Sequence, residues 1–310
     1  MQLFSLYFMT FLLTMGLFSC NSNKEKKHEI KSTDGLRIVS LVPSITKQFY
    51  LLSVEDLVVG HTSYCPDRGL QNSQEIGSAR EVNVEKIVTL QPDVVFASSL
   101  ISQNTMLTLK KLNIRVEYLP TPRSFEELCD QFIQIGKAVD KEDQARKLVY
   151  EQKRKIDSLQ ALIPEQGSPG IFFQLGANPL YAATSKSFVH DYIRFAKATN
   201  IAAGLKSGTI SRESVIIKNP GVILIVTMGG AAEAEKKVWQ QYPNLKAAQD
   251  NNIFIINAEE ACSATPISFT RILEKIIGML YDTLPSSEIE RTGYLAMDTA
   301  EYASLRISSH

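Results

Sequence analysis

The chain has 310 residues, 44% of them hydrophobic, and its 33 basic residues balance its 33 acidic residues. A chain of this length and apolar content can bury a substantial core, either as one large domain or as two lobes. The balanced charge, with no block of basic residues, argues against a nucleic-acid partner. The sequence therefore predicts a folded protein that does not bind nucleic acid.

The first twenty residues form a hydrophobic leader. Residues 3–18 are almost wholly apolar, a length that is short for a membrane span and typical of a signal peptide. The run ends at Cys20, and the polar residues 21–35 that follow are expected to be a tether. A leader that stops at a cysteine resembles a bacterial lipobox, so residues 1–20 are predicted to be a lipoprotein signal peptide with Cys20 as the lipidated residue. A plain hydrophobic anchor is the alternative, because no Lys or Arg precedes the apolar run.

Short apolar runs alternate with helical patterns through the rest of the chain. Most of these runs are continuous in Val, Ile, Leu and Phe, which is typical of strands buried on both faces of a parallel sheet. The predicted fold class is therefore α/β, with mainly parallel sheets. The predicted strands are Arg37–Val42, Leu57–His61, Val94–Ser98, Arg115–Tyr118, Gly170–Leu175, Val222–Val226 and Ile253–Ile256.

A helix-to-strand pattern occurs twice. Glu85 and Glu213 are 128 residues apart, and so are Pro92 and Pro220. In each copy a short helix is expected to end before the proline, and a buried strand follows at once. The repeat predicts two lobes of similar topology.

The longest helical pattern lies between the two halves, from Lys141 to Ile163, and Pro164 ends it. Such a helix would be roughly 34 Å long, which is enough to bridge two lobes. A single bridging helix resists bending, so we expect the lobe motion to be modest. The predicted domains are the N-terminal lobe 36–139, the bridging helix 140–164, the C-terminal lobe 168–284 and a tail 285–310 without an assigned role.

Several segments, in order along the chain, resemble the class III substrate-binding proteins of ABC importers. This group serves vitamin B12, haem and ferric siderophores. Residues 37–46 resemble the family's opening strand and first helix, and residues 59–66 its second strand and cleft loop. Residues 83–95 fit its most recognisable stretch, and residues 178–191 are similar to the start of its second lobe. The B12-binding branch looks the most similar.

The resemblance implies two β/α lobes joined by one long helix, with a ligand held in the cleft between them. It further implies a monomeric, lipid-anchored protein of the periplasm or cell envelope that has no cofactor and is not an enzyme. Its partners would be a metal chelate and the permease and ATPase subunits of an ABC importer. A corrinoid such as cobalamin is favoured as the ligand, followed by haem or a ferric siderophore.

Loops at the carboxyl ends of the predicted strands are the expected ligand-binding segments. Ser44 is expected to cap the helix that follows it. Tyr64 and Tyr181, one on each lobe, offer aromatic rings to a macrocycle. Cys65 and Cys262 could give a soft ligand to a metal, although a small residue in a tight turn is the simpler interpretation. The candidate ligand-binding residues are Pro43, Ser44, Tyr64, Cys65, Ser98, Tyr181, Glu259, Glu260 and Cys262.

Members of the family dock onto the transporter through a carboxylate on each lobe, and charge pairs of this kind set orientation and association rate. The resemblance points to Glu233 and Glu235 in the C-terminal lobe. In the N-terminal lobe, Gln103 stands where a glutamate is expected. Ala79 and Ser98 stand where B12-binding relatives can carry tryptophan, which weakens the assignment of the ligand.

Two other functions stay open. The chain has no G-x-S-x-G, H-E-x-x-H, P-loop or G-x-G-x-x-G motif. A metal-dependent periplasmic enzyme would require Cys65, Cys262 and His61 to converge within coordination distance. A ligand-less adaptor lipoprotein on the same scaffold is the remaining alternative, because aromatic and arginine contacts expected for the ligand are missing.

Overall fold

The computed structural model describes residues 35–66, 70, 72–78, 80–165, 167–226 and 231–281. The predicted signal peptide with Cys20, the tether up to residue 34 and the tail from residue 285 lie outside these ranges. Within the described ranges, no helix combines the length and the apolar character that a membrane crossing requires.

The first half of the described chain forms a five-stranded sheet in the order β3-β2-β1-β4-β5. All of its strand pairs are parallel. The central strands β1 and β4 are buried at every position, as their continuous apolar sequence predicts. The strands are β1 (Ile38–Ser40), β2 (Val58–His61), β3 (Gln74–Glu75), β4 (Val94–Ala97) and β5 (Val116–Tyr118).

The second half forms another five-stranded sheet, in the order β10-β9-β6-β7, with β8 pairing with β6. Its pairs are parallel except that β7 turns back antiparallel to β6. Each predicted strand overlaps an observed one, whereas the sequence analysis did not predict β3, β7 and β8, which are short and contain polar or small residues in place of a continuous apolar run. The strands are β6 (Gly170–Ala177), β7 (Leu180–Ala182), β8 (Thr199–Asn200), β9 (Val222–Ile225) and β10 (Ile253–Ile255).

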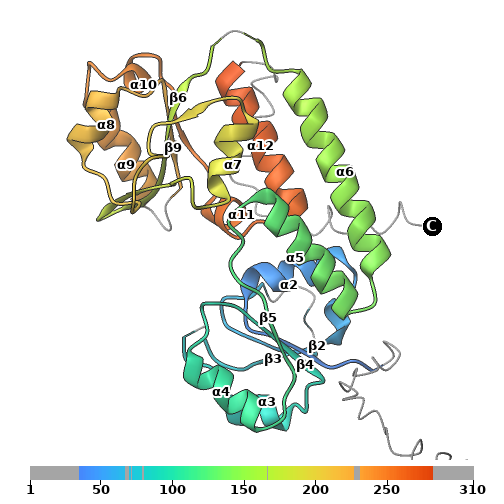
Figure 1. Ribbon diagram of the computed structural model, residues 1–310. Coiled ribbons are helices and arrows are strands. Elements are labelled where there is room, and N and C mark those ends of the chain that lie inside the picture. The colour runs from blue at the N-terminus through green and yellow to red at the C-terminus, as the bar shows by residue number, and fades with distance from the viewer. Residues whose placement is uncertain are drawn as a thin grey trace, which may run out of the picture. The chain divides into compact units, whose positions relative to one another are not determined.

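Helices connect the parallel strands (Figure 1). The first half contains α2 (Pro43–Leu51), the short 3-10 helix η1 (Glu55–Leu57), α3 (Val84–Thr89) and α4 (Gln103–Lys111). The second half contains α7 (Val189–Phe195), α8 (Arg212–Lys218), α9 (Ala231–Gln240), α10 (Lys246–Gln249), α11 (Ala258–Cys262) and α12 (Pro266–Tyr281).

The sequence repeat corresponds to α3 with β4 in one half and to α8 with β9 in the other. Side-chain oxygens of Asn83 and Ser211 cap the two helices in the same way, each accepting from the backbone N–H three residues later. Gln91 and Asn219, the residues before the two prolines, both adopt a left-handed backbone, with φ of 46° and 43°. The repeat therefore extends to the backbone joint between helix and strand.

The 20-residue helix α6 (Glu142–Ala161) lies between the two sheets in the chain, which confirms the predicted fold of two parallel-sheet lobes and one long connecting helix. The helix is not alone, however. It packs against α5 (Phe125–Ala138) and against α12, and α12 also contacts α7 of the second half. Gly136 of α5 makes the first contact possible, because a Cβ there would lie 2.6 Å from the Cβ of Ala145. The connection is therefore a layer of packed helices.

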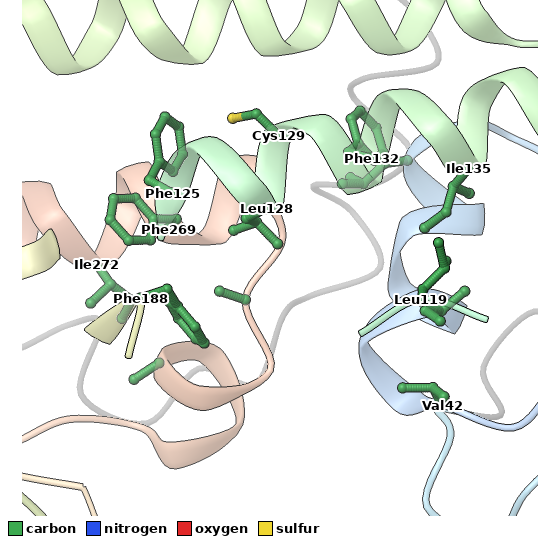
Figure 2. Close-up of a cluster of buried hydrophobic side chains, with 14 of the residues drawn as sticks. Val42, Leu119, Phe125, Leu128, Cys129, Phe132, Ile135, Phe188, Phe269 and Ile272 are labelled. Atoms are coloured by element: carbon green, nitrogen blue, oxygen red, sulfur yellow. The ribbon is translucent and has the colours of Figure 1, made fainter. Parts of the chain in front are cut away.

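One continuous cluster of buried apolar side chains contains residues from both sheets, such as Val95 of β4 and Leu224 of β9. Its centre is aromatic: the ring centroid of Phe269 lies 4.2 Å from that of Tyr192 and 4.5 Å from that of Phe125. Figure 2 shows Phe125 and Phe269 near one end of α5, with Ile135 at the other end pointing toward Leu119 of the first half. A second, smaller cluster around Trp239 fills the other face of the second sheet.

We expect Phe269→Ala to lower the free energy of unfolding by about 3–5 kcal/mol, because the change opens a cavity at a fully buried aromatic site. Chemical denaturation followed by circular dichroism measures it. Ile217→Ala is the control, since Ile217 is 83% exposed and should change the free energy by less than about 0.5 kcal/mol. Equal effects of the two variants would contradict this role of Phe269.

Candidate functional site

The candidate site lies at the carboxyl ends of the parallel strands, where the connecting loops of each sheet begin. In the first sheet, α2 follows β1, the turn with Tyr64 and Cys65 follows β2, and Ser98 follows β4. In the second sheet, the β7 hairpin follows β6 and α11 follows β10. Loops in this position supply ligand contacts in open α/β sheets. Ala79 and the loop after β9, residues 227–230, lie outside the described part of the chain.

Pro43 and Ser44 are the first two residues of α2, and both are half-buried. The helix begins at Pro43, and Val42 occupies the N-cap position without a side-chain cap. The prediction that Ser44 caps this helix is therefore wrong. Proline is favoured as the first helical residue because it has no N–H to leave unpaired, so it moves the start of the helix ahead of the serine.

Tyr64 and Cys65 are neighbours with opposite environments. Tyr64 is 68% exposed, whereas Cys65 is buried. The Cys65 thiol lies 3.2 Å from the Thr62 hydroxyl and 3.8 Å from the backbone oxygen of Ser40, to which it donates. Cys65 thus packs the turn against β1, while the Tyr64 side chain faces solvent.

Ser98 and His61 each hold a loop in place. Ser98 is buried, and its hydroxyl accepts a hydrogen bond from the backbone N–H of Leu100 at 3.3 Å. His61 is 8% exposed, and its Nδ1 lies 2.8 Å from the Ser73 hydroxyl. Both contacts fix the backbone beside the candidate site.

Tyr181 lies on β7 and its ring is seated on Gly208. A Cβ at position 208 would lie 2.3 Å from the Cζ of Tyr181 and 2.7 Å from the backbone oxygen of Ala182. The two segments are also joined by the hydrogen bond from Ala182 N to Gly208 O, at 2.8 Å. Tyr181 remains 44% exposed, so its ring is held in position and still accessible.

A pocket of about 280 Å³ opens beside Tyr181. It lies at the end of β6, between the loop that precedes α7 and the segment that contains Gly208. Its lining residues are Leu175, Tyr181, Ala182, Ala183, Thr184, Lys186, Ser187, Lys206, Ser207 and Gly208. The sequence prediction named only Tyr181 among them. The signal it missed is a Lys-Ser step in each of two loops, at 186–187 and 206–207, with no acidic residue beside either.

An ion pair joins α2 of the first half to α11 of the second. The Lys47 ammonium lies 3.1 Å from the Glu259 carboxylate and also donates to the backbone oxygen of Glu259 at 3.2 Å. The side chain of Lys47 is only 8% exposed, whereas that of Glu259 is 70% exposed. Glu259 therefore already binds a partner from the first half, and the neighbouring Glu260 is buried against Lys275 at 3.5 Å.

Cys262 is the last residue of α11 and is exposed as a whole. Desolvation by the surrounding protein nevertheless raises the pKa of its thiol to about 11. A thiol with that pKa is protonated at neutral pH, whereas the thiolate is the form that binds metals. Across the described residues, no group of three or more His, Cys, Asp and Glu side chains could hold a metal ion. Cys65, Cys262 and His61 therefore do not form the metal centre that the enzyme alternative requires.

The predicted docking residues differ in exposure. Gln103, the first residue of α4, and Glu233, in the first turn of α9, are both exposed. Glu235 is 8% exposed, and its carboxylate accepts hydrogen bonds from Arg212 at 2.7 and 2.8 Å and from Gln174 at 2.9 Å. Glu235 is thus committed to the interior of the second lobe, and Glu233 is the carboxylate that this helix presents.

The profile of the periplasmic binding protein family matches residues 38–260, from the first strand of one sheet to the last helix but one of the other. The chain belongs to this family. It is a transport binding protein and not an enzyme, and its resemblance to the class III group is confirmed.

Among curated proteins, this binding protein is 30% identical over 210 residues to the uncharacterized ABC transporter substrate-binding lipoprotein YvrC of Bacillus subtilis (strain 168). The match covers 65% of this chain and 66% of that protein. The vitamin B12-binding protein of Vibrio parahaemolyticus is 22% identical over 245 residues, or 77% of this chain and 87% of that protein.

Among solved structures, the periplasmic haem-binding protein HutB of Vibrio cholerae superposes with a TM-score of 0.71 at 23% identity. The superposition covers 80% of this chain and 99% of that one. The vitamin B12-binding protein BtuF of the same species gives 0.66 at 22% identity, over 80% and 97%. At these identities the structures establish the fold of the binding protein.

We expect Lys47→Met to lower the free energy of unfolding by about 1–2 kcal/mol, because it removes a largely buried charge-assisted hydrogen bond between the two halves. Glu259→Gln should have a smaller effect, below about 1 kcal/mol, because the backbone oxygen of Glu259 still receives the ammonium and its carboxylate is exposed. Urea denaturation of the two variants distinguishes the contributions. A larger loss in Glu259→Gln than in Lys47→Met would contradict this division.

Gly208→Ala should lower the free energy of unfolding by about 1–3 kcal/mol, because a methyl group there overlaps the Tyr181 ring and the Ala182 backbone. Gly204→Ala is a matched control in the same lobe. A Cβ at Gly204 meets nothing within 4 Å, so that change should leave stability the same or raise it slightly. Thermal unfolding measures both, and a neutral Gly208→Ala would show that the ring is not seated as described.

Proposed function

We propose that the chain is an extracytoplasmic lipoprotein that captures a metal chelate between its two lobes and delivers it to an ABC importer. The observation that carries this proposal is the family match, which spans both parallel sheets and the loops at their carboxyl ends. The relative YvrC, named as a substrate-binding lipoprotein of an ABC transporter, supports the lipid anchor at Cys20. The domain division predicted from the sequence, with lobes at 36–139 and 168–284, is part of the same proposal.

The names of the relatives favour a chelate of cobalt or iron. Vitamin B12-binding proteins from Vibrio parahaemolyticus and Photorhabdus laumondii support a corrinoid as the first candidate. An Fe(3+)-citrate-binding protein of Bacillus subtilis, 25% identical over 184 residues, supports a ferric chelate as the next. The exposed rings of Tyr64 and Tyr181 suit either, because both offer aromatic surface beside polar loops.

We further propose that the protein is a monomer and docks onto the permease subunits of its importer through Glu233 on the C-terminal lobe. On the N-terminal lobe, Gln103 takes the place of a carboxylate, so the contact there relies on hydrogen bonding and not on charge. Exposed charge pairs mainly set orientation and association rate, so this asymmetry should slow docking more than it weakens it.

Titration of the purified protein with cobalamin, haem, ferric citrate and a hydroxamate ferric siderophore tests the proposed function. We expect saturable one-to-one binding of one class in calorimetry. Trp239, the one tryptophan in the sequence, is buried and gives a second readout, because a coloured chelate in the cleft quenches its emission by energy transfer. Absence of binding to all four would refute the proposal and favour the adaptor alternative.

A further inference from the structure

The pocket beside Tyr181 is rich in hydrogen-bond donors and carries positive charge. Its ten lining residues include Lys186 and Lys206, the hydroxyl groups of Thr184, Ser187 and Ser207, and no Asp or Glu. The Lys186 ammonium lies 3.5 Å from the backbone oxygen of Lys206, so the two charged loops meet at the rim. A cavity lined in this way has a positive potential that favours an anion.

Neither lysine is used elsewhere in the described structure. Several other cations there form ion pairs, among them Lys153 with Glu126 at 2.6 Å and Lys155 with Glu274 at 2.7 Å. Among the ion pairs of the described residues, none includes Lys186 or Lys206, and both residues are exposed. Both residues line the same pocket, so an anion bound there would meet two positively charged residues and no carboxylate of the lining.

The frame of the pocket is fixed by short-range contacts. The Tyr181 ring rests on Gly208, and the Ser185 hydroxyl donates to the backbone oxygen of Ala203 at 2.9 Å. These contacts hold the loop that carries Lys186 against the segment that carries Lys206. Preorganised donors need little rearrangement when they bind, which favours recognition of a defined group.

Size decides which part of a ligand the pocket can take. Its volume of about 280 Å³ is below the roughly 300–1,000 Å³ of sites that enclose a drug-sized molecule. A pocket of this size does not enclose a corrin or haem macrocycle, whereas it can take a carboxylate or phosphodiester arm. The pocket belongs to the second lobe alone and lies at the carboxyl end of β6, the sheet edge at which the loops of that lobe would contact a ligand held between the lobes.

We propose that Lys186, Lys206 and the surrounding hydroxyl groups form a subsite for an oxyanion on the chelate, so that this protein selects chelates with an anionic arm. The inference rests on the proposed function and narrows its ligand class. The anion is a phosphodiester if the ligand is cobalamin, and a carboxylate if the ligand is haem or ferric citrate.

Matched pairs of ligands, titrated by calorimetry, test the subsite. Cobalamin pairs with cobinamide, which lacks the phosphodiester nucleotide arm; haem pairs with its dimethyl ester; and ferric citrate pairs with a hydroxamate ferric chelate that lacks carboxylates. We expect Lys186→Gln and Lys206→Gln each to lower the affinity for the anionic ligand of a pair about fivefold, which is the size of effect that a solvent-exposed ion pair gives. The affinity for the other ligand of the pair should not change. The pair that responds identifies the source of the anion.

Lys218→Gln is the matched control, because Lys218 is an exposed lysine of the same lobe that does not line the pocket. Added salt should lower the affinity of the unchanged protein for the anionic ligand, because salt screens the charges. The effect of salt should be smaller in the double variant Lys186→Gln with Lys206→Gln. If Lys186→Gln, Lys206→Gln and Lys218→Gln bind the anionic chelate with equal affinity, the subsite is overturned. The proposed function would still stand, because the chelate binds.

Metal-free citrate separates failure of the subsite from failure of the proposed function. In the full chain, carbon-13 methylation of the lysines keeps their charge and makes each one visible by NMR. Citrate should shift the signals of Lys186 and Lys206, assigned with the two glutamine variants, and leave Lys218 in place. Selective shifts support the subsite even if no chelate binds. Uniform or absent shifts overturn it.

Discussion

Both lobes of this protein depend on one shared apolar core. The stacked rings of Phe269 and Tyr192, with Phe125 beside them, lie where α12, α7 and α5 meet, and the same buried cluster continues into both sheets. Separation of the lobes would expose this surface to water, and burial of apolar area stabilises by roughly 25 cal/mol per Å². A hydrogen bond links the same helices, because the backbone N–H of Phe125 donates to the buried carboxylate of Asp191 at 2.7 Å and joins the start of α5 to α7. Large hinge opening is therefore opposed by packing as well as by the resistance of α6 to bending.

A binding protein with a fixed frame must obtain its specificity from the loops. The two lobes differ here even though they repeat a topology. The first presents an exposed tyrosine in a turn after β2, whereas the second presents a tyrosine held by a hairpin and flanked by two lysines. The Lys47–Glu259 pair lies between α2 and α11, both of which follow the carboxyl ends of strands. The first lobe thus presents an exposed aromatic ring, whereas the second presents a ring beside positive charge.

Much of the fold could be predicted from the sequence because buried parallel strands leave an unmistakable apolar pattern. The long helix and the repeat of α3–β4 in α8–β9 were readable for the same reason. What could not be read depends on contacts between distant segments. Three contacts of this kind join residues that are far apart in the chain. They are the packing of α6 against α5 and α12, the contact of the Tyr181 ring with Gly208, and the ion pair of Lys47 with Glu259. The cap assigned to Ser44 failed for a local reason, since a proline one position earlier starts the helix. Glu235 was assigned to the surface because nothing in its own segment reveals that Arg212 and Gln174 enclose it.

The residues before the two prolines share a left-handed backbone but differ in side chain, with glutamine in the first half and asparagine in the second. Asparagine accepts a positive φ more readily than most residues, and the side-chain oxygen of Asn219 accepts a hydrogen bond from the backbone N–H of Lys246 at 2.8 Å. Glutamine at the equivalent joint carries strain of order 1 kcal/mol. The turn from helix to strand at Asn219 therefore has little backbone strain, whereas the equivalent turn at Gln91 is strained. The first half therefore keeps strain at its helix-to-strand corner that the equivalent corner of the second half largely avoids.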